Sequence, residues 1–82
     1  MKAYVLVNTD IGEELEVVKA LRNAKCPNNH DCIRSVDFTF GPYDVVATIE
    51  GADLAQLGKF VALVIRGIPG VRETVTCVAV ET

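Results

Sequence analysis

Tryptophan is absent from this sequence, histidine occurs once, and no hydrophobic stretch is long. The apolar run Val61–Ile65 is bracketed by Lys59 and Arg66, so it falls far short of the ~20 apolar residues that a membrane-spanning helix requires. The apolar residues near the amino terminus end at Asn8 and lack the small-residue cleavage site of a signal peptide. We therefore expect a cytoplasmic protein without a membrane partner.

Basic residues are also sparse, since eight Lys and Arg face eleven Asp and Glu, for a net charge of −3. Binding to duplex nucleic acid needs clustered Lys and Arg that displace counterions from the phosphates. Here the basic residues are spread along the chain, at Lys2, Lys19, Arg22, Lys25, Arg34, Lys59, Arg66 and Arg72. We expect no direct contact with nucleic acid.

Catalytic groups are scarce as well. The lone histidine, His30, has no nucleophile and orienting carboxylate beside it in the sequence, although a catalytic base of that kind needs both. We therefore predict no catalytic residues, no enzyme activity and no cofactor.

Two of the three cysteines end the segment Cys26–Cys32, which also contains His30. Zinc binds thiolates and imidazole, but its sites usually use more closely spaced cysteines and four ligands, so no metal site is predicted. Free thiols are the expected state. Two alternatives stay open: zinc, or a disulfide, which is unusual in a mesophile cytosol but common in hyperthermophiles. Cys77, inside an apolar strand, is expected to be a small core residue.

What the sequence does contain is typical of a folded domain. Half of the 82 residues are hydrophobic and 23% are charged, whereas disordered chains combine low hydrophobicity with high net charge. The length fits one domain, residues 1–82, and leaves no room for a second.

Four segments have the β-branched and aromatic composition of strands, namely residues 2–8, 33–40, 44–50 and 71–81. The tight connection Gly41-Pro42-Tyr43 joins the middle two, which predicts a hairpin with a short loop.

A first helix is expected over residues 11–25, because apolar residues recur there at helical spacing. Asp10 and Glu13 have the spacing of a capping box at its start, and Pro27 ends it.

A second helix is expected over residues 53–66, with Asp53 and Gln56 repeating the capping pattern. Gly67 stands where a left-handed residue commonly terminates a helix. Gly58 lowers the helix propensity of the interior, and close packing of the helix on the sheet is the simplest reason for it.

This order of elements predicts an α+β fold, the ferredoxin-like βαββαβ arrangement with a four-stranded antiparallel sheet and two helices on one face. The open face of such a sheet should alternate to polar residues if it met water. Instead, Ala3–Val7, Val45–Ala47 and Cys77–Val80 are apolar at consecutive positions, and therefore on both faces. Because an apolar patch of this kind usually marks an interface, we expect a face-to-face homodimer, a dimeric αβ barrel.

Three segments carry a resemblance to a known family. They are the hairpin Phe40–Val46, the end of the second helix with its turn, Ile65–Val71, and the opening of the last strand, Val71–Thr76. In this order and spacing they resemble the effector-binding (RAM) domain of Lrp/AsnC-type transcriptional regulators, over nearly the whole chain. The resemblance implies a homodimer that assembles into higher oligomers. It also implies that amino acids or related small effectors bind between subunits.

Carried over residue by residue, the resemblance implies a ligand site made of Gly41, Tyr43 and Asp44 from the hairpin and of Thr74 and Thr76 from the final strand. Asp44 would pair with the ammonium group of an amino acid, or cap local amides after a turn. Tyr43 would wall the pocket or pack on a neighbouring subunit. The two threonines share one strand face, but threonine is also an ordinary strand residue.

The chain departs from the family in two respects. Family members carry an amino-terminal helix-turn-helix, whereas here the chain starts at the first strand, so DNA binding is not carried over. The segment Cys26–Cys32 is longer than the short Pro-Gly-Val turn usual in the family.

The leading hypothesis is a regulatory domain that binds an amino-acid-like effector, oligomerises and modulates transcription indirectly, through Lrp/AsnC-type helix-turn-helix partners. Two other classes stay open, a ligand-free interaction module and a small dimeric αβ-barrel enzyme, since one fold hosts several functions.

Overall fold

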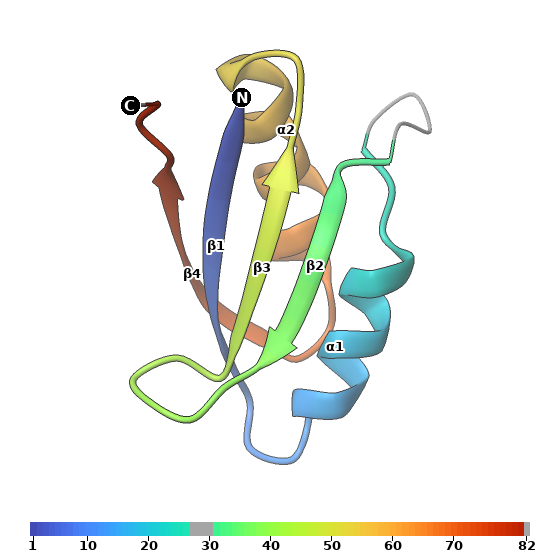
Figure 1. Ribbon diagram of the computed structural model, residues 1–82. Coiled ribbons are helices and arrows are strands. Elements are labelled where there is room, and N and C mark those ends of the chain that lie inside the picture. Colours follow the sequence, from blue (N-terminus) through green and yellow to red (C-terminus); the bar gives the residue numbers. More distant parts are fainter. Residues whose placement is uncertain (27–30, 82) are drawn as a thin grey trace.

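The computed structural model describes residues 1–26 and 31–81. Four strands form one antiparallel sheet in the order β2-β3-β1-β4, and both helices cover the same face of it (Figure 1). This is the predicted ferredoxin-like βαββαβ arrangement. The elements in chain order are β1 (Lys2–Thr9), α1 (Glu14–Asn23), β2 (Ile33–Phe38), β3 (Val45–Glu50), α2 (Leu54–Leu63), the 3₁₀ turn η2 (Ile65–Gly67) and β4 (Val71–Val78).

The hydrophobic core lies between the sheet and the two helices. The helix-facing side chains of the two central strands are fully buried, namely Ala3, Val5, Val7, Val45, Ala47 and Ile49. The helices cover them with Val17, Val18 and Leu21 of α1 and Leu57, Phe60 and Val61 of α2. Burial of each Val, Leu or Ile is worth about 1.5–3 kcal/mol relative to exposure. This layer is therefore the main source of stability in so short a chain.

The start of α1 differs from the prediction. Asp10 is not the N-cap residue of this helix. The N-cap is Glu13, and no side chain accepts a hydrogen bond from the free amides of the first turn. Instead, the Asp10 amide donates a 2.8 Å hydrogen bond to the Gly70 carbonyl, which joins the end of β1 to the turn before β4. The expected helix over residues 11–25 is accordingly shorter, and Pro27, expected to end it, lies outside the described residues.

The start of α2 confirms its predicted cap. The Gln56 amide donates to Asp53 Oδ1 at 2.8 Å, and Gln56 Oε1 accepts from the Ala52 amide at 2.6 Å. These two bonds satisfy donors that an uncapped helix would leave free.

Two glycines have other roles than those predicted. Gly67 belongs to η2, and the glycine with positive φ in this region is Gly70, at +94°. A Cβ at Gly70 would lie 2.9 Å from the Cβ of Glu13, so the turn needs glycine for space as well as for conformation. Gly58 is exposed, and a Cβ there would meet nothing within 4 Å. Close packing on the sheet is therefore the wrong explanation for Gly58.

Cys26 and Cys32 form a disulfide, with their Cα atoms 5.7 Å apart. The expectation of free thiols is wrong, because both sulfur-bearing side chains are almost fully buried against the core and face each other. The bond joins the segment after α1 to the residue before β2. It also removes both thiolates from any zinc site.

The face of the sheet away from the helices has an apolar centre, as the consecutive apolar residues of the strands predicted. Directly opposed residues share a face, and the register places Tyr4 opposite Cys77, and Leu6 opposite both Val46 and Val75. Cys77 is exposed on this face, so the expectation of a core cysteine is wrong for the single chain. We call Tyr4, Leu6, Val46, Val75 and Cys77 the outer patch.

The disulfide is expected to stabilise the fold by restricting the unfolded chain. For a loop this short the loss in a Cys26→Ala/Cys32→Ala double variant should be about 2 kcal/mol, measured by chemical denaturation. Dithiothreitol should lower the melting temperature of the natural protein and leave that of the double variant unchanged. An equal response of the two proteins to the reductant would contradict the bond.

Candidate functional site

Four of the five site residues predicted from the sequence, Gly41, Tyr43, Asp44 and Thr74, lie toward one end of the sheet. The β2–β3 connection and the start of β4 come together there, at the bottom of Figure 1. Val7 of β1 is paired with Val45 on one side and with Thr74 on the other. Thr74 is therefore at a level similar to that of the hairpin, whereas Thr76, opposite Val5, is nearer the middle of the sheet, and β1 separates both threonines from the hairpin.

The carboxylate of Asp44 is already engaged within the chain. Its Oδ2 accepts from the Thr9 amide at 2.9 Å and from the Thr9 hydroxyl at 3.3 Å. The Asp44 amide in turn donates to the Val7 carbonyl at 2.9 Å. Thr9 is buried, so these bonds fasten the hairpin to the end of β1. The sequence had offered amides near the turn as the alternative partner, whereas the observed partner lies 35 residues away; Oδ1 is left for a further partner.

The rest of the hairpin loop is held together by two hydrogen bonds from Thr39 to carbonyl groups on the other side of the turn. The Thr39 hydroxyl donates to the Tyr43 carbonyl at 2.8 Å, and the Thr39 amide donates to the Asp44 carbonyl at 2.9 Å. Gly41 has a φ of +145°, a conformation in which glycine is strongly favoured. Tyr43 is half-buried, so the loop presents the phenol in a defined place.

The hairpin also carries a residue that the sequence reasoning missed. Phe40 is fully exposed, although the side chain of phenylalanine is usually buried. The signal in the sequence is its place directly before the turn residues Gly41-Pro42, and the structure ends the β2 ladder earlier, at Phe38 with Val45. An exposed aromatic ring at a loop tip is suited to contact a neighbouring molecule.

The two threonines share one face of β4, as predicted from strand alternation, and that face is the helix side of the sheet. Their register partners on β1 are Val7 and Val5, which are both buried under the helices. Thr76 is nevertheless exposed, as is Val78, which lies two residues further on the same face. The reason is that α2 does not cover the helix side of the edge strand β4 at these residues.

Each threonine lines a groove. The polar groove has a volume of about 370 Å³ and is lined by Arg66, Val71, Arg72, Glu73 and Thr74. The apolar groove has a volume of about 350 Å³ and lies between α2 and β4, where it is lined by Ala3, Leu54, Leu57, Gly58, Val61, Ala62, Arg66, Thr76 and Val78. Both volumes are within the range of small-molecule sites, and Arg66 borders both grooves.

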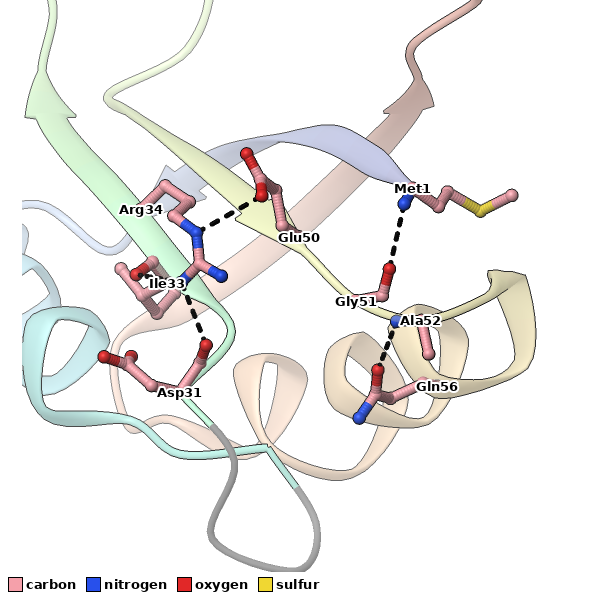
Figure 2. A network of polar contacts seen from close by, with 8 residues as sticks. All are labelled: Met1, Asp31, Ile33, Arg34, Glu50, Gly51, Ala52 and Gln56. Atoms are coloured by element: carbon pink, nitrogen blue, oxygen red, sulfur yellow. Dashed lines mark hydrogen bonds and ion pairs between the residues drawn. The ribbon is translucent and has the colours of Figure 1, made fainter.

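A second set of polar groups lies at the opposite end of the sheet (Figure 2). Arg34 Nε pairs with Glu50 Oε2 at 3.3 Å, and Arg34 Nη1 donates to the Asp31 carbonyl at 3.0 Å. The terminal ammonium of Met1 donates to the Gly51 carbonyl at 2.9 Å. One ion pair and two hydrogen bonds to main-chain carbonyls thus tie the strand ends together.

Within the described ranges, 1–26 and 31–81, there is no group of three or more His, Cys, Asp or Glu side chains that could hold a metal ion. His30, the imidazole of the alternative zinc set, lies outside them. In the same ranges, no helix has the length and apolar content needed to cross a membrane.

The fold is that of a small ferredoxin-like domain with two surface grooves beside β4. The family model described as the Lrp/AsnC ligand binding domain matches residues 2–82. The chain belongs to this family, and the resemblance seen in the sequence is confirmed. The family consists of regulatory ligand-binding domains and not of enzymes.

Solved structures with the same fold include small proteins and longer regulators. TTHA0845 from Thermus thermophilus is 26% identical, with a TM-score of 0.86 over 99% of this chain and 94% of that one. PHS023 from Pyrococcus horikoshii, described as a hypothetical protein, is 27% identical, with a TM-score of 0.82 over 99% and 90%. The comparison with curated proteins gave no match.

The transcriptional regulator NMB0573 from Neisseria meningitidis was solved as a complex with L-Met. It is 16% identical, with a TM-score of 0.80 over 98% of this chain and 49% of that one. At this identity the likeness shows the fold alone, and this chain spans about half of the regulator.

The bonds between Asp44 and Thr9 should stabilise the protein without any ligand. An Asp44→Ala variant is expected to lose about 1.5–3 kcal/mol of unfolding free energy, the usual worth of charged hydrogen bonds, as measured by denaturation. Thr9→Val, which removes only the hydroxyl bond, should lose less. An Asp44→Ala variant as stable as the natural protein would show that the carboxylate is kept for a ligand instead.

Proposed function

We propose that residues 1–82 form a stand-alone regulatory domain that binds an amino acid or a related small effector and responds by changing its assembly. The observation that carries this proposal is the match of the whole described chain to a ligand-binding regulatory family. The Neisseria regulator with bound L-Met supports an amino acid as the effector class. On this proposal the chain has no catalytic activity and does not contact DNA itself.

The effector would bind between subunits, with Gly41, Tyr43 and Asp44 from one copy and Thr74 and Thr76 from another. Adjacent strands are about 4.8 Å apart, so β1 separates the hairpin from β4 by roughly 10 Å in one chain. A small effector therefore needs a second copy to reach both groups at once. The exposed ring of Phe40 supports such a contact at the hairpin.

Homodimerisation through the outer patch would shield its apolar centre from water. The rim of the same face carries Lys2, Asp37, Glu50 and Glu73, an apolar centre with a polar rim that resembles protein interfaces. Dimers would join into larger oligomers, or mix with helix-turn-helix members of the family. The effector then shifts the assembly equilibrium by its differential affinity for the two states.

A cytoplasmic location belongs to the same proposal. The Cys26–Cys32 disulfide narrows the kinds of organism in which a cytoplasmic location is expected, because stable intracellular disulfides are common in hyperthermophiles and rare in mesophiles.

A ligand-free interaction module is the second candidate. The observation in its favour is that Asp44 already has two partners within the chain. An αβ-barrel enzyme is less well supported, because Tyr4, Asp37 and Thr48 lie on the face away from the helices and line no interior cavity between the helices and the sheet.

Amino-acid binding is tested by thermal shift against each of the twenty amino acids. An effector present at 100 times its dissociation constant should stabilise the protein by about 2.7 kcal/mol, and the melting temperature should rise accordingly. No shift with any of them at millimolar concentration would overturn amino-acid sensing and favour the interaction module.

The dimer is tested by placing a charge in the outer patch. Leu6→Glu should convert the protein to a monomer in analytical ultracentrifugation, since a buried unpaired carboxylate costs several kcal/mol. Lys19→Glu, an exposed substitution on α1, is the matched control and should leave the dimer intact. A natural protein that sediments as a monomer at micromolar concentration would refute the self-association.

A further inference from the structure

Among the large apolar side chains that the structure describes, Phe40 is the most exposed, and the loop that carries it is braced. Thr39 bonds to the carbonyls of Tyr43 and Asp44 across the turn. Asp44 in turn accepts two hydrogen bonds from Thr9 at the end of β1. The ring is therefore presented from a loop that is tied on both sides. An aromatic side chain gains from burial in an apolar recess, and this one is placed to enter a recess of a neighbouring molecule.

The apolar groove between α2 and β4 is a recess of suitable size, about 350 Å³. It is lined by the buried side chains of Leu57 and Val61 and by the exposed residues Gly58 and Ala62. A Cβ at Gly58 would meet nothing within 4 Å, so the packing of the single chain does not require glycine there. Glycine nevertheless weakens a helix interior relative to alanine. An open groove is the feature that its small size preserves.

The ring of a chain cannot reach the groove of the same chain. The groove is lined by Ala3 of β1 and by Thr76 and Val78 of β4, whereas the hairpin precedes Val45, which is opposite Val7. Positions 3 and 7 of β1 are about 13 Å apart along the strand, and β4 lies two strands, roughly 10 Å, from β3. The hairpin also extends beyond the end of the sheet (Figure 1). A contact between ring and groove therefore joins two copies.

The charges beside the ring and the groove are of opposite sign. Arg66 borders the groove, and no acidic side chain lines it. Within residues 1–26 and 31–81, the Arg66 guanidinium has no hydrogen bond and no ion pair, and Asp44 Oδ1 accepts no hydrogen bond. A carboxylate on the hairpin and a guanidinium at the groove thus both lack a partner in the single chain. Complementary charges of this kind fix the orientation in which two surfaces meet.

We propose that Phe40 of one copy inserts into the apolar groove of another, where Asp44 of the first copy faces Arg66 of the second. The groove is on the helix side of the sheet and the outer patch is on the opposite side, so one chain uses both surfaces at once. The contact joins unlike surfaces, and such contacts repeat until a ring closes.

A single inserted side chain holds two monomers weakly. A dimer formed through the outer patch carries two rings and two grooves, and linked contacts of this kind strengthen each other. This inference rests on the dimer of the proposed function, needs no effector, and assigns the joining of dimers to Phe40 and to the groove over Gly58.

Sedimentation of matched variants tests the ring and the groove separately. The natural protein is expected to form species larger than a dimer at high micromolar concentration. Phe40→Ser should weaken the association of dimers about thirtyfold, as removal of a central aromatic side chain from an interface does. Ile11→Ser, which changes another almost fully exposed apolar side chain, should leave the association unchanged.

Gly58→Leu should cause the same loss by filling the groove, whereas Gly58→Ala should retain the association. Because nothing lies near a Cβ at Gly58, both glycine variants should fold, which circular dichroism and the melting temperature check. An equimolar mixture of Phe40→Ser and Gly58→Leu should associate again, because each protein supplies the half that the other lacks. A mixture that stays dimeric would contradict a contact between ring and groove.

Photochemical cross-linking identifies the contact directly. With benzoylphenylalanine in place of Phe40, irradiation of mixed isotope-labelled and unlabelled protein should link position 40 of one copy to α2 or β4 of another. Cross-links to any other element would place the ring elsewhere and overturn the assignment.

The outcomes separate this inference from the dimer on which it rests. If the natural protein is a dimer up to millimolar concentration, or if Phe40→Ser and Gly58→Leu associate as it does, this inference is wrong and the outer-patch dimer stands. If the natural protein is a monomer throughout, the dimer fails as well.

Discussion

The whole arrangement depends on β1, which is hydrogen-bonded to β3 on one side and to β4 on the other. Its helix-facing residues, Ala3, Val5 and Val7, have no exposed surface. At its carboxyl end, Thr9 is held by Asp44, and the next amide is held by the Gly70 carbonyl. Two connections far apart in the sequence, the hairpin and the turn before β4, are thereby fixed to the end of one strand. The candidate site owes its geometry to these attachments.

Most of the fold could be predicted from local patterns. Strand alternation and helical spacing identify the elements, and the cap formed by Asp53 and Gln56 involves neighbours in sequence. The failures involve distant partners. Asp10 looks like a capping residue, but its amide is bonded to Gly70. The need for glycine at Gly70 likewise comes from its close approach to α1. Spacing alone did not decide between a disulfide and free thiols at Cys26 and Cys32, because that depends on how near the backbone brings them.

The candidate site was predictable to a smaller extent. That Thr74 and Thr76 share a face follows from the period of a strand, and the structure agrees. Asp44 had two possible roles, a ligand contact or a cap of amides near the turn, and neither anticipated its bonds to Thr9, which is distant in the sequence. Arg66 was missed because a basic residue at the end of a helical stretch is ordinary in sequence. Arg66 borders both grooves, and no local pattern reveals the space between α2 and β4.

Both ends of the described chain lie beside each other. The Ala79 amide donates to the Lys2 carbonyl at 2.9 Å, and Figure 1 shows the two termini at the end of the sheet opposite the hairpin. A fluorescent protein, an affinity tag or a DNA-binding module fused to either terminus would thus start on the far side from the polar groove and the loop tip. An attachment at either terminus therefore leaves the hairpin end of the sheet unobstructed.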